Sequence, residues 1–151
     1  MFTTNRIELV GDPDRICDLI YSMAAKIEEW PRILPHYRYL RIVERAGNST
    51  VADFGATRDG IPVRWRAVQE LFPEERRITF RHIRGVTRGM WVEWRIEPTE
   101  GGALVTIDHE LTYSLPVLGP IFARYVVGDL FVHNIASKTL RRMKSLAEAK
   151  N

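Results

Sequence analysis

The fold is decided by an alternating stretch at residues 61–72, which reads IPVRWRAVQELF. Val63 and Trp65 fall on one side of an extended chain, and Arg64 and Arg66 fall on the other, because successive side chains of a strand point to opposite faces. Alternating apolar and polar residues are typical of a half-buried β-strand. This stretch therefore predicts a strand with one face toward a core and the other toward solvent.

The same two-residue period continues on both sides of this stretch. It predicts further strands at residues 3–10, 37–46, 50–58, 77–84, 90–96 and 104–113. Short turns such as Asp59-Gly60 and Gly101-Gly102 link consecutive strands from residue 37 onward. Connections this short join antiparallel neighbours, since parallel strands need a much longer crossover. We therefore expect one antiparallel sheet of seven strands, which curls because sheets twist.

Helical periodicity replaces this alternation in three places. Residues 13–25 begin with Pro13 after Asp12, which is an N-cap followed by proline at the first helical position. A short helix is expected at about 26–30, where proline follows, and the longest helix at about 120–148. Only the long C-terminal helix is large enough to cover the concave face of the sheet. This order of elements predicts an α+β fold.

Length and composition indicate one globular domain over residues 1–151. Hydrophobic residues make up 45% and charged residues 27%, which excludes a disordered tail. The one cysteine, Cys17, cannot form an intramolecular disulfide. No apolar run reaches the ~18 residues that a membrane span needs, and residues 1–10 show no secretory signal. We expect a cytoplasmic protein without stable membrane insertion.

An arginine-rich strand face is the best candidate for a nucleic-acid site. Arg76 and Arg77 lead a run that continues to Arg88, but Glu74 and Glu75 adjoin it, and the net charge is only +3. A solvated strand face explains this pattern better than a phosphate-binding surface, which needs uncompensated Lys and Arg. We therefore expect no nucleic-acid partner.

Three histidines carry the main chemical signal. Strand alternation places His82 and His109 on the face that the long helix covers, and His133 lies on the apolar stripe of that helix. Asp129 precedes His133 by four residues, so the two side chains are helical neighbours. The carboxylate would raise the pKa of the imidazole and suit it to acid–base work. The alternative is a set of satisfied core histidines. No metal-ligand spacing is present, so we expect no metal.

Aromatic residues on the same face offer a second signal. Trp65, Phe80 and Trp94 alternate inward and could stack a planar ligand. The alternative is that they form an ordinary core. Tyr37 could orient or protonate a carbonyl oxygen, or pack at the rim beside Trp30. The pattern leaves both interpretations open.

The order of elements and three short motifs resemble the START-like, or Bet v 1-like, helix-grip superfamily. The motifs are EWPRILPHY at 29–37, VRW at 63–65 and HEL at 109–111. Within the superfamily, the chain is most similar to bacterial polyketide cyclases and aromatases. The resemblance covers essentially the whole chain. It implies a seven-stranded sheet wrapped around the long helix, with a hydrophobic ligand held between them.

The resemblance also implies an activity and site residues. Tyr37 and Trp65 fall on pocket positions of those cyclases, His82 lies near a pocket arginine, and Gln69 stands where they carry an arginine. The implied enzyme binds a hydrophobic poly-carbonyl or aromatic molecule and promotes its cyclisation and dehydration without a cofactor. The catalytic candidates are Tyr37, His82, His109 and His133. The ligand-binding candidates are Trp65, Gln69, Phe80, Trp94, Tyr113, Tyr125 and Asp129.

Relatives with this fold also leave a second function open. The alternative is a non-catalytic protein that binds or transfers a quinone or lipid. A cyclase would have an acyl carrier protein as the partner that delivers its substrate. Both a monomer and a homodimer are compatible with the sequence.

Overall fold

The computed structural model describes residues 2–58, 60–85, 87–111 and 133–150. Strands and helices follow one another in the predicted order. They are β1 (Phe2–Val10), α1 (Pro13–Ala25), the 3-10 helix η1 (Ile27–Glu29), α2 (Trp30–Ile33), β2 (Tyr37–Ala46), β3 (Ser49–Arg58), β4 (Ile61–Phe72), the 3-10 helix η2 (Pro73–Glu75), β5 (Arg77–Gly85), β6 (Met90–Thr99), β7 (Gly102–Leu111) and α4 (His133–Lys150).

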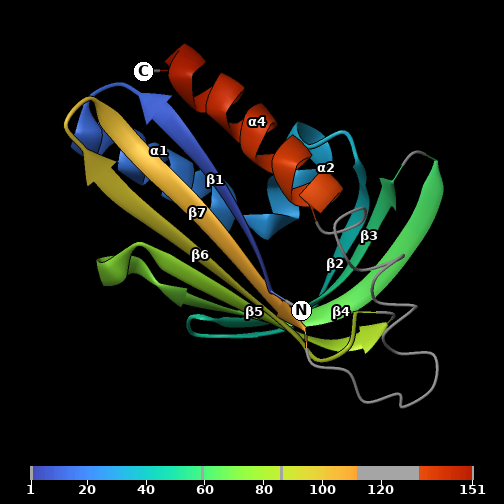
Figure 1. Cartoon of the computed structure of the whole chain (residues 1–151). Coiled ribbons are helices and arrows are strands. Elements are labelled where there is room, and N and C mark those ends of the chain that lie inside the picture. Colours follow the sequence, from blue (N-terminus) through green and yellow to red (C-terminus); the bar gives the residue numbers. More distant parts are fainter. Residues whose placement is uncertain (1, 59, 86, 112–132, 151) are drawn as a thin grey trace.

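The seven described strands form a single antiparallel sheet in the order β1-β7-β6-β5-β4-β3-β2. The sheet curves strongly, and α4 lies across its concave side with α1 and α2 nearby (Figure 1). The predicted α+β architecture, a curved seven-stranded antiparallel sheet around a C-terminal helix, is confirmed.

The second helix does not end where the sequence predicted. Pro31 was expected to end the second helix, but that was wrong, because Pro31 lies in the first turn of α2, which runs from Trp30 to Ile33. Proline is tolerated there, since the first turn of a helix needs no donor from its backbone. The first part of the expected 120–148 helix and the end of the 104–113 strand lie outside the described residues.

The entry into α1 has the expected capping chemistry. The side chain of Asp12 accepts a hydrogen bond from the backbone N–H of Arg15 at 3.1 Å, and this satisfies a donor that the first helical turn leaves free. Ile16, Ile20 and Ala24 are buried on the inward face of α1. The cap and the apolar stripe together place α1 against the sheet.

Trp30 occupies the centre of an aromatic core. Its side chain is 3% exposed, and its ring centroid lies 5.1 Å from that of Tyr37, 6.0 Å from Phe54, 5.9 Å from Phe80 and 6.1 Å from Trp94. The indole Nε1 donates a hydrogen bond to the carbonyl of Met23 at the end of α1. Trp30 therefore ties the helical segment to the concave face of the sheet.

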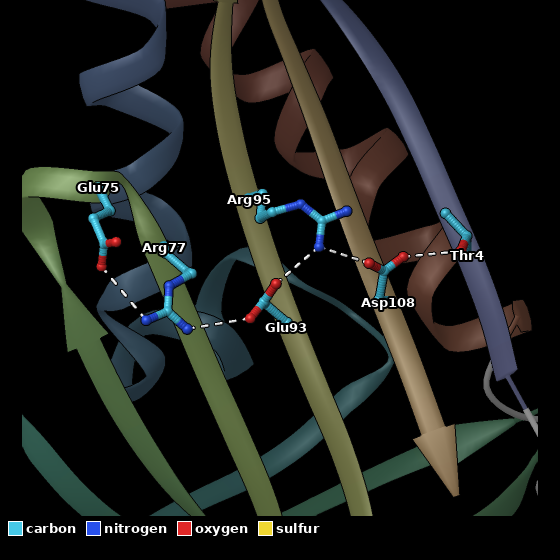
Figure 2. Close-up of polar contacts among 6 residues, drawn as sticks. All are labelled: Thr4, Glu75, Arg77, Glu93, Arg95 and Asp108. Atoms are coloured by element: carbon cyan, nitrogen blue, oxygen red, sulfur yellow. Dashed lines mark hydrogen bonds and ion pairs between the residues drawn. The ribbon is translucent and has the colours of Figure 1, made fainter.

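The outer face of the sheet carries a ladder of ion pairs. Arg95 lies between Glu93 at 2.8 Å and Asp108 at 2.6 Å, and Glu93 also meets Arg77 at 3.2 Å. Thr4 donates a hydrogen bond to Asp108 and extends the ladder to β1 (Figure 2). Part of the arginine-rich run is thus paired with carboxylates on neighbouring strands. Partly exposed ion pairs add little to the free energy of unfolding. Opposite charges facing each other on neighbouring strands do favour this register of the sheet.

Asp53 and Arg66 form an ion pair between β3 and β4. The Asp53 carboxylate accepts two hydrogen bonds from the Arg66 guanidinium at 2.6 and 3.1 Å. Asp53 and Arg66 are directly opposite in the register of β3 and β4. The guanidinium lowers the pKa of the Asp53 carboxyl, first through these hydrogen bonds.

Gly85→Ala is expected to lower the free energy of unfolding by about 1–3 kcal/mol. Gly85 has a φ of +100°, and an added Cβ would lie 2.5 Å from the carbonyl oxygen of Arg64 and 3.0 Å from the Cα of Trp65. Gly101→Ala is the matched control, because a Cβ at Gly101 has no heavy atom within 4 Å. Urea denaturation of both variants checks the difference, and equal midpoints would contradict it.

Candidate ligand cavity

A cavity of about 70 Å³ lies between the concave face of the sheet and α4. Aromatic and aliphatic side chains make up most of its wall, with a few polar groups among them. The lining residues are Trp30, Tyr37, Phe54, Trp65, Phe80, His82, Thr87, Met90, Val92, Trp94, Ile107, His109, Ile135, Ala136 and Thr139. This composition is typical of a small-molecule site, in which apolar walls supply affinity and a few polar groups fix orientation.

His82 forms one polar part of the wall. Its Nδ1 lies 2.6 Å from the Oγ1 of Thr87, and its ring stacks on Trp65 with 5.6 Å between centroids and 3° between planes. Trp65 in turn stacks on Phe54 at 5.3 Å and 5°. Burial, and then the nearby His109, lower the pKa of His82 to about 3. His82 is therefore a neutral imidazole at pH 7, held in one orientation.

His109 contributes a buried ring nitrogen to the site. Its Nδ1 is inaccessible to solvent and makes no hydrogen bond within the described part of the chain. Burial lowers the pKa of His109 to about 4, although Asp108 acts in the opposite direction. A buried polar atom left unpaired costs about 1–3 kcal/mol. The Nδ1 of His109 is thus the position at which a bound oxygen or N–H would gain most.

Tyr37 and Thr139 form a second polar group on the wall. Tyr37 is 7% exposed and Thr139 is 2% exposed, and both line the cavity. Burial raises the pKa of the Tyr37 phenol, while the Thr139 side chain acts to lower it. Tyr37 therefore keeps its proton at neutral pH and can donate a hydrogen bond to a carbonyl oxygen.

The cavity brings together most of the candidates on the strands. Its lining includes six of them, namely Tyr37, Trp65, Phe80, His82, Trp94 and His109. Gln69 is placed differently, because it is 1% exposed, is absent from the lining and donates from Nε2 to the carbonyl of Ala25 at 3.0 Å. Gln69 thus holds the end of α1 against β4.

The helix candidates cannot be placed in the same way. Tyr113, Tyr125 and Asp129 lie outside the described residues. His133 is the first described residue of α4, and its side chain is outside what the structure describes. The Asp129–His133 pair therefore stays a prediction.

Three polar residues near the cavity were not singled out from the sequence. Thr87 bonds His82, Thr139 lines the cavity from α4, and His36 lies 2.8 Å from Thr139. Helical spacing could have indicated Thr139, because it follows Ala136 by three residues and so lies on the same apolar face of α4. No periodic signal marked Thr87, which follows β5, or His36, which precedes β2.

Among the residues that the structure describes, no three His, Cys, Asp or Glu side chains lie close enough together to hold a metal ion. Within the same ranges, no helix is both long and apolar enough to cross a membrane.

Solved structures with the same architecture are numerous. The chain superposes on TTHA0849 from Thermus thermophilus with a TM-score of 0.80 and 22% identity, covering 100% of this chain and 99% of the other. The Zhui aromatase/cyclase from Streptomyces sp. R1128 gives a TM-score of 0.80 at 19% identity, with 99% and 94% covered. A START superfamily protein from Mycobacterium smegmatis gives 0.69 at 19%, with 99% and 95% covered.

This architecture is the helix-grip fold, in which a curved sheet wraps around a C-terminal helix. No curated protein sequence matches the chain. The sequence profile of the family described as polyketide cyclase / dehydrase and lipid transport matches residues 17–136. The chain belongs to that family.

Proposed function

We propose that this protein binds a hydrophobic poly-carbonyl or aromatic small molecule in its cavity and promotes cyclisation and dehydration of that molecule. The observation that carries the proposal is the composition of the cavity wall. Aromatic rings surround a space that Tyr37, whose phenol is protonated, and His109, whose buried Nδ1 has no hydrogen bond within the described residues, both line. A proton donor and a proton acceptor on an otherwise apolar wall are the two groups that an aldol-type ring closure needs.

Positioning would supply much of the rate. The flat walls made by Trp65 and Phe80 favour a planar, partly folded chain over an extended one. Holding a nucleophilic carbon near the carbonyl that it attacks can lower a barrier by up to ~7–11 kcal/mol. Phe54 stacks on Trp65 and packs edge to face on Phe80, so the wall offers a bound chain flat aromatic surfaces.

The proton steps balance with two side chains. In ring closure, Nδ1 of His109 takes a proton from a methylene carbon between two carbonyls. The carbon–carbon bond forms, and the attacked carbonyl oxygen takes the phenolic proton of Tyr37 to become a hydroxyl. In dehydration, that hydroxyl leaves as water with the proton held by His109, and the neighbouring carbon returns a proton to the oxygen of Tyr37. Both residues end in their starting state.

The size of the cavity sets a condition on binding. A volume of about 70 Å³ is well below the ~300–1,000 Å³ of most small-molecule sites. A poly-carbonyl chain therefore requires the walls to move apart as it enters. We expect the bound protein to differ from the free protein in the packing around Trp65 and Phe80.

One observation favours the non-catalytic alternative. The pKa values of His82 and His109, about 3 and about 4, make both rings weak bases in the free protein, whereas a general base works best with a pKa near the working pH. Neutral imidazoles are well suited to holding the head group of a quinone or lipid. An acyl carrier protein as partner, the cytoplasmic location and the oligomeric state stay predictions.

Turnover of a synthetic poly-β-ketone thioester tests the proposal. Tyr37→Phe and His109→Leu are each expected to slow aromatic product formation at least about tenfold, equivalent to about 1.4 kcal/mol, while circular dichroism shows a folded protein. Tyr39→Phe is the matched control, because Tyr39 is on the same strand but 38% exposed. Mass spectrometry that detects loss of water follows the product.

The outcome separates a catalyst from a carrier. If the protein is a carrier, the wild type binds the thioester, yields no product above the buffer background, and both variants change only the Kd. That result would sink the cyclase proposal and favour the carrier.

A further inference from the structure

The outer face of the sheet, which is turned away from α4 (Figure 1), carries two differently charged regions. On β1, β7, β6 and part of β5, arginines and carboxylates alternate in the ladder of Figure 2. On β2 to β5, the strand register instead places Arg41, Asp53, Arg66 and Arg84 side by side, one residue from each strand. We call these four residues the arginine row.

The arginine row points away from the cavity. Phe54 follows Asp53 in the chain and Trp65 precedes Arg66, and both aromatic side chains line the cavity. Successive side chains of a strand point to opposite faces, so Asp53 and Arg66 point outward. At the two ends of the row, the first and last arginines are exposed to solvent.

Asp53 shows how the row holds a carboxylate. Arg66 donates to it from Nε at 2.6 Å and from Nη2 at 3.1 Å, and a guanidinium and a carboxylate match well in such a two-bond pair. These hydrogen bonds are the first cause of the lowered pKa of Asp53, and the charges of Arg41 and Arg84 lower it further. One carboxylate therefore lies among three guanidinium groups, which leaves a surplus of positive charge.

The exposed arginines of this region have no counter-charge of their own. Neither Arg41 nor Arg84 forms an ion pair with any residue that the structure describes. The same holds, within the described ranges, for Arg64 on β4 and Arg81 on β5, which are also exposed. The region is thus short of carboxylates, in contrast to the ladder beside it.

Exposed aromatic rings border the arginine row. Tyr39 is 38% exposed, precedes Arg41 by two residues, and its ring lies directly over Gly55. Trp91 is 40% exposed and lies opposite Arg81 in the register of β5 and β6. Arginine, tyrosine and tryptophan are enriched at the centres of protein–protein interfaces. The mixture of residue types therefore favours a protein partner.

We propose that the arginine row docks an acidic segment of a protein partner, whose carboxylates pair with Arg41 and Arg84 as Asp53 pairs with Arg66. From β2 to β5 the row crosses three gaps between strands. At the usual spacing it spans about 14 Å, the length of about four residues of extended chain. A nucleic acid fits less well, because its binding rests on about 6–10 phosphate contacts and Asp53 would repel the strand.

Binding of a dye-labelled octaglutamate peptide tests the proposal. Fluorescence anisotropy at low ionic strength, where exposed charges are least screened, measures the Kd. The double variant Arg41→Gln, Arg84→Gln is expected to weaken binding at least about fivefold, the weight of one partly exposed ion pair. The control Arg6→Gln, Arg141→Gln removes the same charge from exposed arginines on β1 and α4 and should leave the Kd unchanged. An equal effect of both double variants, or of neither, would overturn the proposal.

Asp53→Asn distinguishes the arginine row from the net charge of the protein. It releases the Arg66 guanidinium from its internal partner and should tighten peptide binding at least about twofold. Glu100→Gln, in the exposed turn between β6 and β7, makes the same change in net charge and should leave the Kd as it was. Equal tightening by both variants would show that net charge alone attracts the peptide. The arginine variants still decide the matter if Asp53→Asn does not fold.

Octathymidylate and phosphatidylserine vesicles stand for the other anionic partners. We expect both to bind more weakly than octaglutamate. Tighter binding of either one, lost in the Arg41→Gln, Arg84→Gln variant, would replace the acidic segment with a phosphate-bearing partner. None of the substituted residues lines the cavity, so the result does not depend on turnover of a poly-β-ketone.

Discussion

Trp30→Ala is expected to lower the free energy of unfolding by about 3–5 kcal/mol, the range found when large aromatic side chains are removed from a core. The side chain is 3% exposed and lies within about 6 Å of four other rings, measured between centroids. Those rings come from different strands, so none can move into the space without leaving its own strand position. The substitution also removes the indole N–H, so the carbonyl of Met23 loses its hydrogen-bond donor.

Two further variants divide this loss into its parts. Trp30→Phe keeps a ring but removes the bond to Met23, so its cost should fall near about 1–3 kcal/mol. Trp91→Ala is the control, because Trp91 is 40% exposed on β6 and its loss should stay within about 1 kcal/mol. Guanidinium denaturation measures all three. A loss below about 1 kcal/mol for Trp30→Ala would show that the cavity collapses easily.

Acidification from pH 7 to pH 5 is expected to lower the free energy of unfolding by about 2 kcal/mol for each of His82 and His109. Burial lowers their pKa values to about 3 and about 4 in the folded protein, whereas an unfolded histidine has a pKa of about 6.5. Between these values the unfolded chain binds a proton and the folded chain does not. Stability is therefore greatest above pH 6.5 and falls as pH falls.

Single variants assign the loss to each ring. His82→Gln and His109→Gln cannot take up a proton, so each should flatten the pH dependence between pH 5 and 7 by about one proton. Carboxylates with a lowered pKa, such as Asp53, affect stability chiefly below about pH 5, which keeps this window clear. Unfolding free energies that stay constant from pH 7 to 5 would show that the rings are solvated.

Strand alternation located most of the candidate site. Side chains alternate between the two faces of every strand, and the apolar set of each strand points toward the core. The inward position of Trp65 on β4 and the apolar residues of the other strands therefore show which side chains face the helix. His82 and His109 were placed correctly beside the helix-covered face for that reason. Gln69 was a candidate through the family resemblance, and it is buried on the same strand as Trp65. The sequence could not show that its amide donates to the carbonyl of Ala25. That contact depends on where α1 ends in space.

Contacts between distant elements were the part that the sequence left open. Thr139 and His36 are 103 positions apart, and no local pattern relates a helix threonine to a residue in the turn before β2. Asp53 pairs with Arg66 because the two residues are opposite each other in the register of β3 and β4. The amino-acid composition does not reveal that register. Side-chain partners across the core follow from tertiary packing, so periodicity predicts the wall but not its hydrogen bonds.

The pairing of β1 with β7 has a consequence for folding during synthesis on the ribosome. Phe2 lies opposite Glu110 and Val10 opposite Gly102, so the first strand finds its neighbour about a hundred residues later. At a synthesis rate of about 5–20 residues per second, β1 spends about 5–20 s outside the ribosome before β7 exists. During that time its edge has no native partner in this sheet, and unpaired edges invite association with other chains. Of the strands in this sheet, β1 is made before the others but is among the last to be paired, and a nascent chain stalled before residue 102 carries it exposed.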